Sequence, residues 1–359
     1  MEGDSERYHR APARQQGFLP ARTSVIGSAL TQLHSSITAP APASSAASLD
    51  ARATAGSAAW RADVVKLAKP GIVKMVLITT AVGFALAAME RGGWTIGSLA
   101  LAALWCMVGT TLSAAGANAL NQAMEFRRDA LMRRTMRRPI PSGRMSVSAG
   151  AWLGALFSLA GVLVLWIGTN QVAALVSLAT ILSYVFVYTP LKPVTPLATL
   201  VGSVPGALPP LIGWSAASDG VWRGLDHPGG WSLFALMFVW QVPHFLAIAW
   251  KCREDYERGG YRMLPLIDAS GSRTAWISLL WAITLIPVSL STVRAMPDRF
   301  GWLFLSVATV VGVGFVISAA RLVAQRTDRR ARELFFASII YLPVALLAMV
   351  ADVLLTAVR

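Results

Sequence analysis

Long apolar segments recur along most of this chain, and they constrain its fold more than any other feature. They lie at roughly 72–89, 96–120, 147–168, 171–189, 196–217, 231–250, 274–293, 301–320 and 334–356. Because about 20 apolar residues cross a bilayer as a helix, each segment is long enough to span a membrane. Only 14% of the residues are charged, whereas a soluble domain carries about a quarter. The sequence therefore predicts an all-α polytopic membrane protein with nine transmembrane helices.

The positive charge of the chain is concentrated in the loops on one side of these predicted helices. The loops after the second, fourth, sixth and eighth helices contain most of the basic residues: Arg127, Arg128, Arg133, Arg134, Arg137, Arg138, Arg144, Lys192, Lys251, Arg253, Arg258, Arg262, Arg273, Arg321, Arg326, Arg329, Arg330 and Arg332. By the positive-inside rule, these loops and the N-terminus lie in the cytoplasm. A net charge of +14 with this distribution predicts contact with membrane lipid and argues against nucleic acid as a partner.

Residues 1–60 differ in composition from the rest of the chain, because they are rich in Ala, Ser, Pro and Thr. Such a segment cannot bury enough apolar surface to offset the entropy that is lost on ordering. We therefore expect a disordered N-terminal tail, residues 1–60, followed by a membrane domain, residues 61–359. The alternative is a cleaved organelle-targeting peptide. Four early arginines favour it, whereas three early acidic residues oppose it, because such peptides are poor in acids.

Three polar side chains recur at four-residue intervals where the second predicted helix reaches the cytoplasmic surface. Asn121, Glu125 and Asp129 occupy positions i, i+4 and i+8, so they share one face of a helix. Mg²⁺ commonly binds through one or two carboxylates, with water and substrate phosphate oxygens completing its octahedron. The alternative is an ordinary helix end, with surface ion pairs from Glu125 to Arg128 and from Asp129 to Arg133.

A second acidic pair, Glu254 and Asp255, follows the sixth predicted helix on the same side of the membrane. Basic residues surround both acidic clusters, and arginine can bind a diphosphate through two parallel hydrogen bonds. The two loops are therefore interpreted as two halves of one site. In this hypothesis the acids hold Mg²⁺, the metal and the cations hold a diphosphate, and the adjoining apolar helices hold its lipid tail.

The fifth predicted helix, residues 196–217, contains Pro205, Pro209 and Pro210 together with three glycines. Proline removes a backbone hydrogen bond and kinks a helix. Within a membrane, such backbone is tolerated where it packs in protein or lines a cavity. A kinked packing helix and a pocket wall therefore both remain open as interpretations of this segment.

Four motifs, taken in their order along the chain, resemble the UbiA-type membrane prenyltransferases. They are "LAKPGIVKMVLITTAVG", "ANALNQAMEFRRDALMRRTMRRPIPSGR", "YTPLKPVTPLATLVGSVPGALPPLIGW" and "WQVPHFLAIAWKCREDYERGGYRMLPL". The resemblance covers about residues 61–350, and the third and fourth motifs are associated with the branch that prenylates haem. It implies nine helices around a central cavity, with Asp-rich loops that bind Mg²⁺ and a prenyl diphosphate.

Carried over residue by residue, the resemblance implies a role for each residue of the site. The expected metal ligands are Asn121, Glu125, Asp129, Glu254 and Asp255. Of these, Glu125, Asp129 and Asp255 are also the expected catalytic residues. The expected diphosphate ligands are Lys69, Arg128, Arg133, Arg137, Arg138 and Lys192. The chain departs from the family at Lys251, where a leading aspartate is expected, and at Pro193 and Val194, where further basic residues are expected.

His244 lies inside the sixth predicted helix, and an ionisable side chain within a membrane segment is a functional candidate. Eleven residues separate it from Asp255, which is about 16 Å along a helix, so it is too deep to ligate the same Mg²⁺. Since a neutral imidazole is a common haem ligand, His244 is predicted to face the haem. A hydrogen-bonded packing histidine is the alternative. Asp352, near the far end of the last helix, has no predicted role.

Aromatic residues could shield a prenyl cation through their ring quadrupoles. The candidates are Trp105, Tyr184, Tyr188, Trp240, Phe245 and Trp250. Most of them are expected to be interface anchors or core residues instead.

The resemblance implies transfer of farnesyl from farnesyl diphosphate to a vinyl group of haem B, giving haem O, with Mg²⁺ as cofactor. A haem A synthase or an oxidase assembly factor would be the downstream partner, in a bacterial cell (inner) membrane or in the mitochondrial inner membrane. Prenylation of a quinone precursor is the alternative among enzymes. A membrane transporter is the alternative from another class, although transporters usually place ionisable groups near the bilayer midplane, whereas these acids lie at one face.

Overall fold

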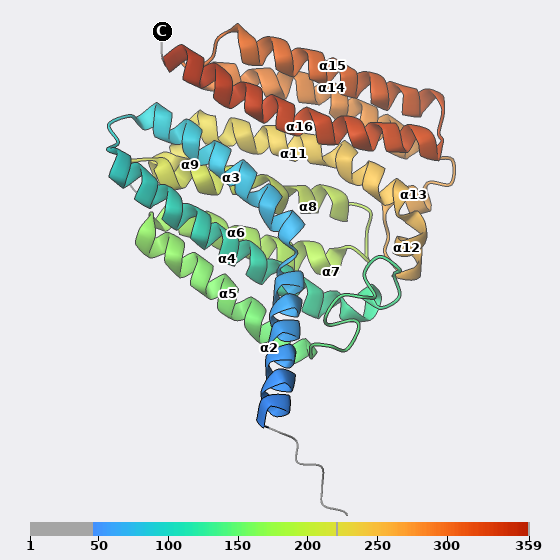
Figure 1. Cartoon of the computed structure of the whole chain (residues 1–359). Helices are drawn as coiled ribbons and strands as arrows, with labels where there is room; N and C mark the ends of the chain where they lie inside the picture. The colour runs from blue at the N-terminus through green and yellow to red at the C-terminus, as the bar shows by residue number, and fades with distance from the viewer. Residues whose placement is uncertain (1–45, 220–221, 358–359) are drawn as a thin grey trace, which may run out of the picture. The chain divides into compact units, whose positions relative to one another are not determined.

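The computed structural model describes residues 46–219 and 222–357, and every element of regular secondary structure within them is helical (Figure 1). The chain divides into two units between Ala58 and Ala59. Of the predicted tail, residues 1–45 lie outside the described residues. The remainder belongs to the first described helix, and the predicted domain boundary at residues 60 and 61 stays a prediction.

The helices differ widely in length, and short helices connect the long ones. In chain order they are α2 (Ala46–Ala68), α3 (Pro70–Arg91), α4 (Ile96–Asp129), α5 (Val147–Gly168), α6 (Gln171–Leu182), the π-helix η1 (Ser183–Tyr188), α7 (Thr189–Leu191), α8 (Ala198–Ala207), α9 (Pro209–Ala217), α10 (Arg223–Asp226), α11 (Pro228–Lys251), α12 (Arg253–Arg258), α13 (Leu264–Ile267), α14 (Ser272–Ala295), α15 (Trp302–Ala324) and α16 (Asp328–Ala357).

Among the described residues, eight helical spans are long and apolar enough to cross a membrane. They are Pro70–Arg91, Ile96–Asp129, Val147–Gly168, Gln171–Leu191, Pro228–Lys251, Ser272–Ala295, Trp302–Ala324 and Asp328–Thr356. The predicted all-α membrane fold is therefore confirmed, whereas the described residues contain eight single long helices and not the predicted nine. The difference lies in the fifth predicted segment, which forms the two short helices α8 and α9.

The break between α8 and α9 falls at Leu208, directly before two successive prolines. Each proline lacks the N–H that would continue the helical hydrogen bonds, so two successive hydrogen bonds are missing where the helix breaks. Every residue of α9 is buried. A side chain at Gly213 would collide with the backbone of Thr80, and one at Gly83 with the backbone of Pro210. The backbones of α3 and α9 are therefore in direct contact, and α9 is a packing helix.

The helices α4 and α5 also approach each other closely, through glycine and serine. A side chain at Gly116 of α4 would collide with Ser158, and one at Gly161 of α5 would collide with Ser113. Inside a bilayer, helices associate through van der Waals packing, which favours small residues at the interface. This contact fixes the position of α4, the helix that carries the predicted metal ligands.

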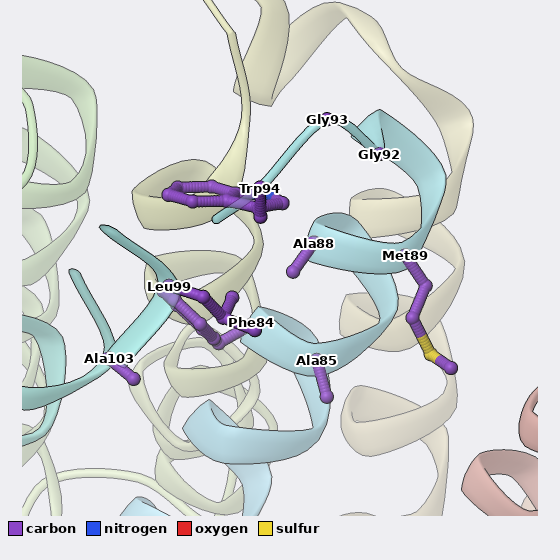
Figure 2. A pocket seen from close by; sticks show the side chains of 9 residues that line it. All are labelled: Phe84, Ala85, Ala88, Met89, Gly92, Gly93, Trp94, Leu99 and Ala103. Atoms are coloured by element: carbon purple, nitrogen blue, oxygen red, sulfur yellow. The ribbon is translucent and has the colours of Figure 1, made fainter. Parts of the chain in front are cut away.

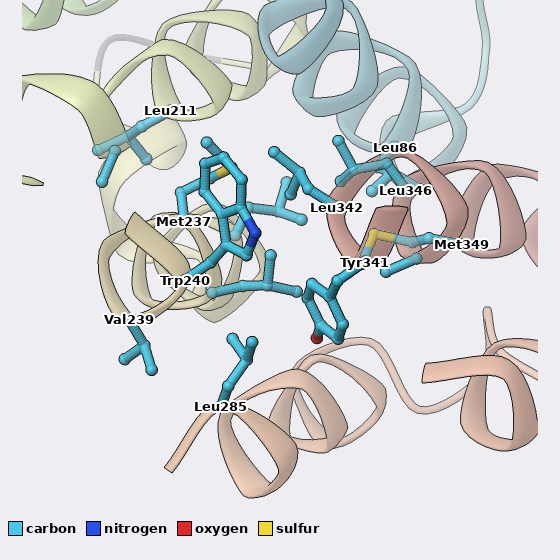
Figure 3. Packing of buried hydrophobic residues seen from close by; sticks show 14 of the residues in the cluster. Leu86, Leu211, Met237, Val239, Trp240, Leu285, Tyr341, Leu342, Leu346 and Met349 are labelled. Carbon is cyan, nitrogen blue, oxygen red and sulfur yellow. The ribbon is translucent and has the colours of Figure 1, made fainter. Parts of the chain in front are cut away.

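The main apolar core includes residues of α3, α9, α11, α14 and α16, and Figure 3 shows its packing around Trp240 and Tyr341. The indole N–H of Trp240 donates to the Ser338 carbonyl at 2.8 Å, which joins α11 to α16. The hydroxyl of Tyr341 is hydrogen-bonded to the hydroxyl of Ser289 on α14. Both aromatic residues thus fill the core while their polar groups stay paired.

Asp352 of α16 stabilises the beginning of α15. Its Oδ2 accepts the backbone N–H groups of Gly301 and Phe304, both at 3.0 Å. The first N–H groups of a helix have no partner within the helix itself, so this carboxylate supplies one from a neighbouring helix. Asp352, for which the sequence suggested no role, is therefore a structural capping residue.

The polar loops gather at one end of the bundle. Figure 1 shows the C-terminal end of α4, the loop that follows it and α12 close together there. A hydrogen bond from the backbone of Arg133 to Asp255 joins the two loops directly. The two acidic clusters, which are far apart in the sequence, are thus neighbours in the fold.

Candidate functional site

The last turns of α4 place Asn121, Glu125 and Asp129 on one buried face. Their exposed fractions are 1%, 6% and 1%, respectively. The side-chain amide of Asn121 donates to Oε2 of Glu125 at 2.8 Å and to the hydroxyl of Thr189 at 3.0 Å. The four-residue spacing therefore places the three side chains on one face of α4, and Asn121 and Glu125 are in direct contact. Two carboxylates that are buried on one helix face require positive charge beside them to stay ionised.

Two ion pairs supply part of that charge. Nζ of Lys192 lies 2.8 Å from Oε1 and 3.0 Å from Oε2 of Glu125. Nη1 of Arg138 lies 2.6 Å from Oδ2 of Asp129. Burial alone would lower the pKa of Lys192, but the adjacent Glu125 carboxylate outweighs burial and raises that pKa. The carboxylates thus pair with cations from other segments or from the following loop.

Lys69 adds a third cation to the same face. Its Nζ donates to Oδ1 of Asn121 at 2.6 Å. Burial, together with the positive charges of Arg138 and Lys192, lowers the pKa of Lys69 to about 7. A bound anion would raise this pKa again, because negative charge nearby favours the protonated ammonium form. The site therefore holds more cationic groups than its two carboxylates can neutralise.

The π-helix η1 directs the residues that follow it toward the site. The Thr189 hydroxyl donates to the Tyr184 carbonyl at 2.9 Å and accepts the amide of Asn121. Nζ of Lys192 lies 4.6 Å from the ring centroid of Tyr188. Single π-helical turns within α-helices are frequent at functional sites. The role of Thr189 was not predicted, since a π turn is a backbone feature without a recognised sequence signal here.

The second acidic loop contributes a link between the two loops. Oδ1 of Asp255 accepts the backbone N–H of Arg133 at 3.0 Å, and its Oδ2 accepts that of Arg134 at 3.3 Å. Arg258 lies 3.7 Å from the same carboxylate. The side chain of Glu254 is 77% exposed and lies 3.8 Å from Arg258. The structure therefore brings Asp255 to the first loop, but Glu254 does not join the buried carboxylates.

Arg128 is the second link between the loops. Its Nη1 donates to the Gly259 carbonyl at 2.8 Å and to the Gly260 carbonyl at 3.1 Å, so it does not form the ion pair with Glu125 that the alternative of an ordinary helix end required. Its guanidinium carbon lies 5.7 Å from the ring centroid of Tyr261. Burial and the nearby Glu125 carboxylate raise the pKa of the Tyr261 phenol. Tyr261 is thus a buried neighbour of the site that the sequence did not reveal.

The two remaining predicted diphosphate ligands lie at the rim of the site. Arg133 and Arg137 are both exposed. In the alternative of an ordinary helix end, Arg133 would pair with Asp129, but Asp129 pairs with Arg138. Arg133 follows the end of α4, so its side chain does not share the helix face that this alternative pairing needed.

His244 belongs to α11, and its side chain contacts α16. Its Nδ1 is 2.7 Å from the hydroxyl of Ser338. The imidazole stacks on Trp240, with centroids 4.6 Å apart, and on Phe335 at 5.5 Å. Within the described residues, its Nε2 has no hydrogen-bond partner. The ring is therefore half-buried and held in one orientation, apart from the carboxylates of α4.

Two of the six aromatic candidates lie in the segment that leads to Lys192. Tyr184 and Tyr188 lie side by side, with ring centroids 5.7 Å apart, directly before Lys192. Trp250 instead donates its indole N–H to Asp328 at 2.9 Å, which ties the end of α11 to the start of α16. The two tyrosines are therefore the candidates that lie nearest to the buried carboxylates.

The donor set of this site fits magnesium that is shared with a substrate. In the part of the chain that the structure describes, no group of three or more His, Cys, Asp or Glu side chains is arranged to hold a metal ion. Asn121, Glu125 and Asp129 supply hard oxygen donors from one helix face. Mg²⁺ is suited to such an incomplete set, because phosphate oxygens and water complete its coordination.

An apolar hollow opens between the end of α3 and the start of α4. It has a volume of about 490 Å³ and is lined by apolar residues, as Figure 2 shows for Phe84, Trp94 and Leu99. It lies at the ends of α3 and α4 opposite to Asn121 and Asp129. This hollow therefore does not belong to the carboxylate site.

Known proteins resemble this chain over most of its length. Residues 76–340 match the UbiA prenyltransferase family. The protoheme IX farnesyltransferase of Solibacter usitatus is 40% identical over 286 residues, which cover 78% of this chain and 95% of that protein. The protein of the same name from Opitutus terrae is 41% identical over 303 residues, which cover 83% of this chain and 97% of that protein. The mitochondrial protoheme IX farnesyltransferase of Arabidopsis thaliana is 37% identical over 279 residues, which cover 78% of this chain and 62% of that protein.

Solved structures share the fold at low sequence identity. Digeranylgeranylglyceryl phosphate synthase superposes with a TM-score of 0.66 at 15% identity, over 81% of this chain and 97% of that one. A UbiA homolog from Archaeoglobus fulgidus bound to GPP and Mg²⁺ superposes with a TM-score of 0.56 at 13% identity, over 80% and 99%. With its helical membrane fold and its family match over residues 76–340, the chain belongs to the UbiA prenyltransferase family.

Proposed function

We propose that the chain transfers a farnesyl group from farnesyl diphosphate to a vinyl group of haem B, with Mg²⁺ as cofactor, and so produces haem O. The observation that supports prenyl transfer is the buried face of α4. There Glu125 pairs with Lys192 and Asp129 pairs with Arg138, and Lys69 is hydrogen-bonded to Asn121 on the same face. The choice of haem B and farnesyl rests on relatives at about 40% identity that are named protoheme IX farnesyltransferase.

The first task of the site is to bind the diphosphate and stabilise it as it leaves. In this proposal Asn121, Glu125 and Asp129 would hold Mg²⁺, which supplies charge stabilisation to the departing diphosphate when bound. Lys192 and Arg138 would exchange their carboxylate partners for phosphate oxygens. Asp255 would hold the backbone of the first loop in place, and its role as a metal ligand stays a prediction.

The second task is to guide the allylic cation to the acceptor. The bond between the farnesyl carbon and the diphosphate oxygen breaks, and the oxygen keeps both electrons. The haem vinyl group then supplies the electron pair for the new carbon–carbon bond. Water adds its oxygen to the cation that remains and loses a proton, which completes the hydroxyethylfarnesyl group. The rings of Tyr184 and Tyr188, beside Lys192, are suited to stabilise the allylic cation.

His244 is the proposed contact to the haem. The hydrogen bond between its Nδ1 and Ser338 leaves Nε2 free, and the stacking on Trp240 and Phe335 fixes the plane of the ring. An imidazole that is oriented through one nitrogen is suited to ligate iron through the other. Haem would therefore be bound at the seam of α11 and α16.

The proposed location is a bacterial cell membrane, with the N-terminus and the carboxylate loops in the cytoplasm. The bacterial relatives support this location. The mitochondrial relative from Arabidopsis thaliana makes the mitochondrial inner membrane the alternative. Haem O would then be available to a haem A synthase or to an oxidase assembly factor as the downstream partner.

The proposed reaction is tested with the purified full-length protein in detergent or lipid. Haem B, farnesyl diphosphate and Mg²⁺ are supplied together, and the extracted products are identified by mass. We expect haem O, and no prenylated product when a quinone precursor replaces haem B. Prenylation of the quinone precursor without any haem O would contradict the proposed acceptor.

A further inference from the structure

The junction of α2 and α3 contains two carbonyl groups that no helical N–H can reach. In a continuous helix the carbonyls of Leu67 and Ala68 would accept the N–H groups of Gly71 and Ile72. Here α2 ends at Ala68, α3 begins at Pro70, and the N–H of Ile72 bonds to the Lys69 carbonyl instead. The last carbonyls of a helix require partners from outside it. The amide of Asn118 donates to the Ala68 carbonyl at 3.1 Å.

Gln122 completes this arrangement from the next turn of α4. Its amide donates to the Leu67 carbonyl at 3.3 Å. The exposed fractions of Asn118 and Gln122 are 3% and 0%, so neither amide exchanges this partner for water. Both residues flank Asn121 on the same stretch of helix, and α4 therefore supports the α2–α3 junction and the metal-binding face together.

The junction holds Lys69 in a strained backbone conformation. Its φ of 55° makes it the one non-glycine residue with positive φ among residues 46–219 and 222–357. A residue before proline normally relaxes to an extended conformation, which is open to lysine without strain. Here the left-handed conformation directs the ammonium group to Asn121, 2.6 Å away. Strain of this kind persists only where the surrounding structure enforces it.

We propose that Asn118 and Gln122 are positioning residues for diphosphate binding. By holding the last two carbonyls of α2, they keep Lys69 in the left-handed conformation that delivers its ammonium group to the diphosphate. The inference rests on the proposed function, because it requires a diphosphate at the face of Asn121, Glu125 and Asp129. It adds two residues that act through Lys69 and do not touch the substrate themselves.

The test measures the affinity of the purified full-length protein for farnesyl thiodiphosphate, a slowly reacting analogue, with Mg²⁺ present. Asn118→Leu and Gln122→Met keep the approximate size of each side chain but remove its donor. We expect each variant to bind the analogue about tenfold more weakly. This corresponds to a loss of about 1.4 kcal/mol in binding free energy. Lys69→Met should lose at least as much affinity, because it removes the ammonium group itself.

A double-mutant cycle separates positioning from general destabilisation. If Asn118 acts through Lys69, then Asn118→Leu in the Lys69→Met background should cause no further loss of affinity. A full additional tenfold loss in that background would overturn the inference, as would unchanged affinity in Asn118→Leu alone. If Asn118→Leu cannot be purified, the same double-mutant cycle is measured with Asn118→Ala, which has a smaller side chain.

The matched control is Asn170, whose amide donates to the Ser215 carbonyl at 2.6 Å near the other end of the bundle. Asn170→Leu should lower the thermal midpoint but leave the affinity for the analogue unchanged. A loss of affinity in this control equal to that of Asn118→Leu would overturn the inference. Wild-type protein that does not bind the analogue at all would contradict the proposed function itself, which distinguishes the two failures.

Discussion

Lys69 combines a left-handed backbone conformation with a buried ammonium group, and both features destabilise the folded chain. Asn adopts the left-handed region far more readily than lysine does. We therefore expect Lys69→Asn to raise the free energy of unfolding by about 1 kcal/mol, while it weakens the binding of farnesyl thiodiphosphate. Thermal denaturation and calorimetry measure the two effects separately. A Lys69→Asn protein that is less stable but binds normally would show that Lys69 serves the fold alone.

The individual residues also show which part of the site could be predicted. The four-residue spacing of Asn121, Glu125 and Asp129 depends only on helix geometry, so their shared face followed from the sequence. Their ion-pair partners did not follow, because Lys192 comes from a segment 67 residues away from Glu125. Helical spacing predicts only ion-pair partners within the same helix, whereas tertiary packing determines which cations from other segments lie beside each carboxylate.

At the level of helices, the contact of α4 and α5 should be sensitive to side-chain size. A leucine at Gly116 would collide with the backbone and hydroxyl of Ser158 and with the Gly154 carbonyl. We expect Gly116→Leu to destabilise the fold by about 1–3 kcal/mol, as overpacking does. Gly314 is the control, since a side chain there meets no atom within 4 Å. Equal thermal midpoints of Gly116→Leu and Gly314→Leu would contradict the importance of this close contact.

The cap that α16 provides for α15 leads to a second prediction at this level. Asp352→Ala leaves the N–H groups of Gly301 and Phe304 without their acceptor. We expect a loss of about 1–2 kcal/mol in stability, with unchanged affinity for farnesyl thiodiphosphate. Asp352→Asn keeps an oxygen acceptor and should lose less. If Asp352→Ala abolished analogue binding in a protein that remained folded, Asp352 would have a role beyond capping.

The helices themselves show where prediction from sequence reached its limit. Apolar length identified the segments that became α3, α4, α5, α11, α14, α15 and α16. The same criterion merged α8 and α9 into one predicted span, although Pro205, Pro209 and Pro210 had already indicated an irregular backbone. Hydropathy measures whether a segment prefers lipid, but it does not say whether its hydrogen bonds run without a break.

The whole molecule has one predicted orientation in the membrane. The loop after α4 and the segment before α11 should lie on opposite sides of the membrane. The five arginines of that loop mark it as cytoplasmic, and α8 and α9, which follow each other in the chain, together lead to the opposite end of the bundle. Met136 and Trp222 are exposed positions in these two regions. With Cys106 and Cys252 replaced, Met136→Cys should react with an impermeant thiol reagent from the cytoplasmic side only. Trp222→Cys should react from the opposite side, and labelling of both from one side would refute this topology.

Calorimetric titration of farnesyl thiodiphosphate, with and without Mg²⁺, measures most directly whether the buried face of α4 binds a metal and a diphosphate together. Asp129→Asn keeps the size of the side chain but removes its charge, and Asp352→Asn applies the same change to a buried carboxylate outside the site. We predict that Mg²⁺ strengthens analogue binding in the wild type and in Asp352→Asn, and that this enhancement is lost in Asp129→Asn. An equal enhancement by Mg²⁺ in all three proteins would contradict the assignment of the site to Asn121, Glu125 and Asp129.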